Sequence, residues 1–194
     1  MNMIKTYRRD EAGALHYLEC WDHNSTFYVH KGKVGTKGQS LTRVLRGRNR
    51  PTSPTLQESV DSFRTEAAAK GYAELADDDR GWLVLQVTLL SEDLSHEADL
   101  RVFDELPDAI NDYVGWRGVG HYDGNDIGSG KINFFLPVAD NEIAVKVVRR
   151  FLKEFGAPQP MLIATRAPVS SDPEADYTVA WAQRKGDRES FSLF

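Results

Sequence analysis

The fold of the first part of the chain depends on the stretch ALHYLECWDHNSTFYVH, residues 14–30. Aromatic and aliphatic residues on both sides of the polar DHNS segment suit two strands that are joined by a turn. Gly32, Gly35 and Gly38 then mark a tight segment, after which residues 39–45 favour a further strand. Because these strands follow one another closely in the sequence, they predict a small antiparallel sheet.

A helix is expected after these strands. Residues 46–55 contain two prolines and no apolar residue, which indicates an exposed loop. Apolar residues then recur with a helical period at Val60, Phe63 and Ala67, and Gly71 is placed to end the helix. The sequence therefore predicts an N-terminal unit over residues 1–75, made of antiparallel strands and one helix.

The acidic segment at residues 76–81 predicts a boundary, because the pattern of strands and helices starts again after it. Strand patterns cover residues 82–90, 119–123, 132–138 and 161–165; helical patterns cover residues 100–114 and 141–155; and a glycine-rich turn is expected at residues 124–130. Pro107 is compatible with a helix mainly in its first turn, which puts the start of the first helix in question. The order strand-helix-strand-strand-helix-strand predicts a ferredoxin-like sandwich over residues 82–167, with both helices on one face of an antiparallel sheet. Residues 168–194 add an edge strand at 177–182 and a tail, so the predicted fold class is α+β.

The composition favours a cytoplasmic protein. The chain has 194 residues, of which 41% are hydrophobic, and it contains no apolar stretch long enough to cross a bilayer and no signal-peptide pattern. The chain has a single cysteine, Cys20, so no internal disulfide is possible, and its apolar neighbours Leu18 and Trp21 favour a buried strand thiol. We expect no membrane partner.

Charge divides unevenly between the two units. Residues 1–75 hold 12 basic and 8 acidic side chains, a balance of +4, and residues 76–194 hold 12 basic and 21 acidic side chains, a balance of -9. No acidic residue lies between positions 31 and 50, and the basic residues there are Lys31, Lys33, Lys37, Arg43, Arg46, Arg48 and Arg50. Such a run attracts phosphates, because binding releases counterions from a nucleic acid. The alternative is a solvated loop that balances the acidic second unit.

The run HKGKVGTKGQ, residues 30–39, follows the aromatic hairpin and precedes Phe63 and the Lys70-Gly71-Tyr72 triplet. With this spacing, residues of about 14–75 resemble the WGR family, which is named for a Trp-Gly-Arg triplet. The resemblance implies a module that accompanies poly(ADP-ribose) polymerases and bacterial regulators related to the molybdate-metabolism regulator, and that contacts DNA ends and neighbouring domains in the polymerases. Lys31 and Lys33 stand where the family has Trp and Arg, so the implied contact is attraction of phosphate by point charges.

The sequence contains no complete catalytic constellation. It lacks a Gly-x-Ser-x-Gly motif, and its glycine-rich segment at residues 124–130 lies between predicted strands, unlike a phosphate-binding loop. The five histidines show no metal-helix spacing. His121, Asp123 and Asp126 offer a weaker possibility of a ligand or enzymatic site in the second unit. We expect no enzyme, no cofactor and no metal.

A protein partner is expected at the acidic second unit, through Asp104, Glu105 and Asp108 on the first predicted helix, although a solvated helix face gives the same pattern. The sequence thus predicts a non-enzymatic regulatory or DNA-associated binding protein. The alternative is a protein-interaction or immunity-type factor that has no nucleic-acid contact.

Overall fold

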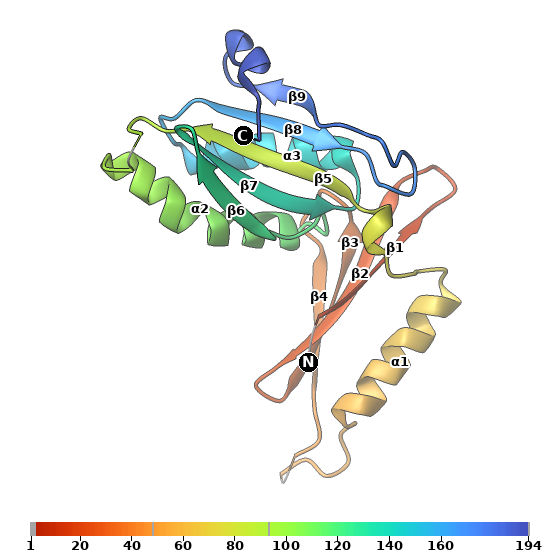
Figure 1. Cartoon of the computed structure of the whole chain (residues 1–194). Coiled ribbons are helices and arrows are strands. Elements are labelled where there is room, and N and C mark those ends of the chain that lie inside the picture. Colours follow the sequence, from red (N-terminus) through yellow and green to blue (C-terminus); the bar gives the residue numbers. More distant parts are fainter. Residues whose placement is uncertain (1–2, 48, 93, 194) are drawn as a thin grey trace. The chain divides into compact units, whose positions relative to one another are not determined.

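The computed structural model describes residues 3–47, 49–92 and 94–193. The chain forms two compact units, Met1–Leu75 and Ala76–Phe194. Within the described residues the fold is mixed α+β, with antiparallel sheets of four and five strands and three α-helices (Figure 1).

The sheet of the first unit has the strand order β1-β2-β3-β4, with every pair antiparallel. Its strands are β1 (Ile4–Arg9), β2 (Leu15–His23), β3 (Thr26–Lys33) and β4 (Gln39–Val44). The expected hairpin is present, and Asn24 and Ser25 form its turn with positive φ angles of 47° and 58°, which match the twist of the strands. Strand β1 was not predicted from the sequence.

Helix α1 (Leu56–Ala69) covers one face of this sheet. Thr55 caps its N-terminus, accepting a hydrogen bond from the Glu58 backbone while the Glu58 carboxylate accepts from the Thr55 backbone. Gly71 follows the helix with a φ of +74°. The buried apolar side chains of the helix, Val60, Phe63 and Ala67, join a core with Leu18, Cys20, Phe27 and Leu45.

Cys20 is fully buried in this core, as the sequence predicts. Burial raises the pKa of its thiol to about 12, because the thiolate would lose its hydration. The side chain therefore acts as a small apolar group of the core.

The second unit has the element order β5 (Gly81–Thr88), α2 (Glu97–Gly115), β6 (Gly124–Gly128), β7 (Lys131–Val138), α3 (Asn141–Phe155), β8 (Met161–Arg166) and β9 (Thr178–Ala182). Short 3₁₀ helices, Asp77–Asp79 and Lys185–Ser190, lie before and after these elements. The strand order is β6-β7-β5-β8-β9, and all neighbouring strands are antiparallel.

Apolar side chains of α2 and α3 provide much of the core of this unit. Val102, Leu106, Ile110 and Val114 are buried on α2, and Ala144, Val147, Val148 and Phe151 are buried on α3. In the sheet, Leu83, Leu85, Phe134 and Ile163 are fully buried. The C-terminal segment also contacts the sheet, since Gln86 donates to the carbonyl of Ser192 at 2.8 Å and Lys131 donates to the carbonyl of Ser190.

The first of the two middle strands was predicted at the wrong residues. Residues 119–123 form only an isolated bridge, between Gly120 and Val138, and β6 begins at Gly124 where a turn was expected. The turn is shorter and lies at Ser129 and Gly130, which have φ angles of 50° and 70°. Glycine and asparagine are weak strand formers, and pairing with β7 overrides that tendency.

Helix α2 begins at Glu97, three residues before the expected start at Leu100. Pro107 lies inside the helix, as it also does in the predicted range of residues 100–114. The predicted helix was therefore correct except for its first turn, and burial of the apolar face of α2 outweighs the cost of the backbone donor that Pro107 lacks.

Candidate nucleic-acid interface

The basic run extends over β3, the connection to β4, β4 itself and the loop after it. Lys31 and Lys33 lie on β3, Lys37 lies in the connection and Arg43 lies on β4, and all four residues are exposed. Arg46 and Arg50 are exposed in the following loop, and Arg48 lies outside the described residues. The three lysines therefore lie at the end of β3 and in the connection that follows it, and the described arginines lie on β4 and in the loop after β4.

Lys31, Lys33 and Lys37 border one open hollow, which His16, Gly32, Gly38, Gln39 and Tyr72 also line. Gly38 is needed for the close approach of the backbone at this place. A β-carbon on Gly38 would lie 2.2 Å from the Tyr17 hydroxyl, 2.4 Å from the Lys31 carbonyl and 2.6 Å from Nε2 of His30. The glycine thus lets the connection lie directly on buried polar side chains of the sheet.

These buried side chains form a hydrogen-bonded chain that was not predicted from the sequence. The Glu19 carboxylate lies 2.8 Å from Nζ of Lys5 and 2.7 Å from Nδ1 of His30. A carboxylate accepts, so Nδ1 of His30 donates to it, and Nε2 lies 3.2 Å from the Tyr17 hydroxyl. Their alternation along β2 and β3 was the available signal, because Tyr17, Glu19 and His30 share one face of the sheet.

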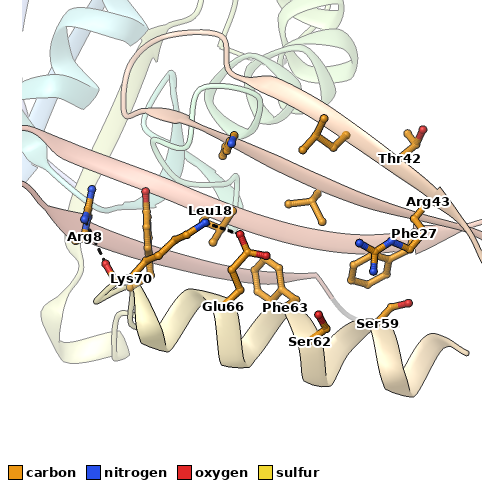
Figure 2. Close-up of a pocket in the computed structure, with 14 residues that line it drawn as sticks. Arg8, Leu18, Phe27, Thr42, Arg43, Ser59, Ser62, Phe63, Glu66 and Lys70 are labelled. Atoms are coloured by element: carbon orange, nitrogen blue, oxygen red, sulfur yellow. Dashed lines mark hydrogen bonds and ion pairs between the residues drawn. The ribbon is translucent and has the colours of Figure 1, made fainter. Parts of the chain in front are cut away.

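The opposite face of the sheet and helix α1 border a partly open cavity of about 260 Å³ (Figure 2). Its apolar lining includes Leu18, Phe27, Val29, Leu41 and Phe63. Four cations, Arg8, Lys31, Arg43 and Lys70, line it together with one carboxylate, Glu66. The cavity is therefore apolar in part and carries an excess of positive charge.

Two of the four cations of the cavity have close partners there. Lys70 forms an ion pair with Glu66, and Arg8 donates to the Lys70 carbonyl at 3.3 Å while its guanidinium lies 5.2 Å from the centre of the Tyr72 ring. The hydrogen bond from Lys70, and then the charges of Lys31 and Arg43, lower the pKa of Glu66. Lys31 and Arg43 thus act on Glu66 through space.

Arg46 has a structural contact. It donates to the Ser53 carbonyl at 2.8 Å and lies 3.5 Å from Glu58, so it connects the loop to the first turn of α1. The backbones of Gly47 and Arg50 form a short bridge in the same loop. These two arginines lie in a different part of the unit from the hollow lined by the lysines.

Asp104, Glu105 and Asp108 are exposed on α2, as expected for a solvated or partner-facing helix surface. Glu105 forms an ion pair with Arg101 at 3.0 Å. Leu100, one turn before Asp104, has 45% of its surface exposed. The acidic surface thus contains an apolar side chain.

The structure supplies no metal cluster at His121, Asp123 and Asp126. In residues 3–47, 49–92 and 94–193, no group of three or more histidine, cysteine, aspartate or glutamate side chains is arranged to hold a metal ion. Asp126 instead accepts a hydrogen bond from Asn133 at 2.8 Å. None of the helices in the described part of the chain has the length and apolar character that spanning a membrane requires.

Comparison of the chain with protein-family models, with curated proteins and with solved structures gives no significant match.

Proposed function

We propose that the chain is a non-enzymatic, DNA-associated regulatory protein whose first unit binds nucleic-acid phosphates. The observation that carries this proposal is the hollow bordered by Lys31, Lys33 and Lys37. Three exposed ammonium groups around one concave surface can each approach a phosphate and release counterions. A lysine needs no fixed geometry for this contact, so the surface attracts the backbone and does not read bases.

We propose further that the first unit is a WGR-like module and the second a ferredoxin-like sandwich. The first assignment is supported by the glycine spacing and by a four-stranded antiparallel sheet with one helix. The second is supported by the order β5-α2-β6-β7-α3-β8 and by the position of β5 between β7 and β8. A fold of either kind serves many functions, so the proposal of DNA association rests on the lysines.

The test is a comparison of two triple variants in binding to intact, nicked and blunt-ended DNA and to RNA at several salt concentrations. Replacing Lys31, Lys33 and Lys37 with alanine should weaken binding and reduce the slope of log affinity against log salt by roughly 2 to 3, because each lost phosphate contact removes about 0.9. The matched control replaces Lys146, Arg150 and Lys153 of α3, which are exposed and remove the same charge. Equal losses in both variants, or no binding at low salt, would count against the proposal.

A second candidate function is contact with a protein partner through α2 and without nucleic acid. The specific observation in its favour is the exposed Leu100 beside Asp104, Glu105 and Asp108, since apolar side chains within a charged surface are common at interfaces. Replacing the three acidic residues with lysine should abolish binding to a defined partner. Retention of that partner at unchanged affinity would refute this candidate.

A further inference from the structure

The two edges of the first sheet differ in their protection. At the β1 edge, the segment after α1 pairs with the strand: the Tyr7 amide donates to the Ala73 carbonyl at 2.7 Å, and the Ala73 amide donates to the Tyr7 carbonyl at 3.0 Å. At the other edge, β3 is the sole strand that pairs with β4 in the part of the chain that the structure describes. All six residues of β4 are exposed.

The register shows which backbone groups of β4 face outward. The Leu45 amide donates to the Ser25 carbonyl at 2.9 Å, and the next pair along is Val44 with Thr26. Because hydrogen-bonded and non-hydrogen-bonded pairs alternate in an antiparallel ladder, Arg43 and Leu41 direct their amide and carbonyl groups to β3. Ser40, Thr42 and Val44 direct theirs to the open edge.

Strand β4 carries little of the protection that sheet edges usually have. The strand has no proline, its register with β3 runs without a bulge, and its one charged residue, Arg43, lines the cavity. Leu41 is 59% exposed and Val44 is 41% exposed. Proteins usually protect an apolar edge with charge, proline or a bulge, because such an edge accepts another strand.

The cavity supplies side-chain recognition beside the open edge. Leu41 and Arg43 line it from β4, and their partners on β3, Val29 and Phe27, line its apolar part. Lys31 also lines it, and with four cations against one carboxylate the surface favours an acidic group. A strand added next to β4 would place alternate side chains over this side of the sheet.

We propose that β4 binds an extended peptide segment as a fifth strand of the sheet. The main chain of the peptide pairs with the outward groups of Ser40, Thr42 and Val44. On the cavity side, the peptide places an apolar side chain next to Leu41 and an acidic side chain, two residues away, next to Arg43. This function is distinct from phosphate binding, which is assigned to the hollow at Lys31, Lys33 and Lys37, although the hollow and the cavity share Lys31 and Tyr72.

An acidic peptide fits this edge better than a nucleic acid or a second copy of the chain does. A nucleic acid lacks the main-chain donors and acceptors of a strand and gains little from the exposed Leu41. Pairing of two β4 strands would bring the Arg43 and Lys31 cations of both copies close together, which is unfavourable. The apolar wall and the excess of positive charge therefore favour a peptide with alternating apolar and acidic residues.

The test is selection of random peptides of about eight residues, long enough to form a strand, displayed on phage and presented to the full chain. Enriched peptides should share an apolar and an acidic residue two positions apart. Thr42→Pro removes an outward amide and leaves the ladder to β3 intact, as proline allows at an edge. This substitution should lower the affinity for the selected peptides by about tenfold or more, since it removes one main-chain hydrogen bond and disturbs the register.

A second variant and a second readout keep the test decisive if Thr42→Pro fails to fold. Arg43→Glu leaves the backbone unchanged and should shift the enriched peptides from acidic to basic residues at that position. Amide hydrogen exchange of the wild-type complex should show new protection at Ser40, Thr42 and Val44. The proposal would be overturned if the enriched peptides lacked the pattern, or if a folded Thr42→Pro variant bound them as well as the wild type does. Unchanged exchange at these amides, or a dimer that Thr42→Pro abolishes, would also overturn it.

Measuring DNA binding and peptide binding in the same variants distinguishes the peptide site from the phosphate site. Thr42→Pro should leave the salt dependence of DNA binding unchanged, and Lys33→Ala with Lys37→Ala should leave peptide binding unchanged. Failure of DNA binding in the wild type would therefore not affect the peptide proposal. Loss of both activities in Thr42→Pro, with the fold retained, would contradict the separation of the two surfaces.

Discussion

At the scale of single residues, Gly38 determines how closely the β3–β4 connection approaches the buried side chains of the first sheet. A β-carbon there would meet the Tyr17 hydroxyl, the Lys31 carbonyl and Nε2 of His30, all within 2.6 Å. We predict that Gly38→Ala lowers the free energy of unfolding of the first unit by about 1–3 kcal/mol, the range typical of overpacking. Urea unfolding measures this change.

Gly47→Ala is the matched control for this substitution, because a β-carbon on Gly47 would meet no atom within 4 Å. The control should leave the unfolding free energy nearly unchanged. If both variants lose the same stability, the close contact at Gly38 does not constrain the connection. Lys31, whose carbonyl is among the contacted atoms, would also move in Gly38→Ala, so phosphate binding should weaken in that variant.

Asp99 is a fully buried carboxylate in the second unit, and five polar contacts hold it. It accepts hydrogen bonds from the Leu90 amide, the Ser91 amide and hydroxyl, and the Gln159 side chain, at 2.9–3.2 Å. Asp99→Asn would turn an amide NH2, which can only donate, toward these donors. We predict a loss of about 1–3 kcal/mol in unfolding free energy at pH 7, measured by urea unfolding. The control is Asp104→Asn, which changes an exposed residue of the same helix and should have little effect.

The pH dependence of this loss follows from the pKa of Asp99. Burial raises that pKa, but the hydrogen bonds from Gln159, Leu90 and Ser91 outweigh burial and hold the pKa below its ordinary value of 3.8. The carboxylate therefore contributes its full stability above pH 3.8, and the contribution is lost as pH falls through the folded pKa. The stability difference between wild type and Asp99→Asn should narrow in strong acid; a difference that grows on acidification would contradict this assignment.

At the scale of elements, the sequence predicts best those segments whose own pattern determines their structure. Helix α3, with apolar residues at helical spacing, occupies residues 141–155 as expected. Strand β6 could not be found in the same way, because Gly124, Asn125 and Gly128 are typical of turns and the strand forms through pairing with β7. Strand β1 alternates little in hydrophobicity, and its pairing with β2 stabilises it.

The candidate site likewise has features that the sequence predicts and features that depend on the fold. The exposure of Lys31, Lys33 and Lys37 could be expected from their charge, whereas the cavity could not. Arg8 and Lys70 line that cavity from opposite ends of the unit's sequence, and only the fold brings them together. The buried contacts of Glu19 and His30 likewise depend on the register between β2 and β3, which a sequence pattern alone does not determine.

At the scale of the whole molecule, each unit has its own core, which predicts that the two units open independently. Gly38→Ala perturbs a contact within residues 1–75, and Asp99→Asn perturbs a contact within residues 76–194. Amide hydrogen exchange measured by mass spectrometry reports both units in one sample. Gly38→Ala should accelerate exchange in β1 to α1 and leave β5 to β9 unchanged, and Asp99→Asn should do the reverse. If either variant accelerated exchange in both units, the chain would unfold as one cooperative body. A ligand bound at β4 would then stabilise the second unit as well, because binding to the native state stabilises every part that unfolds together with the binding site.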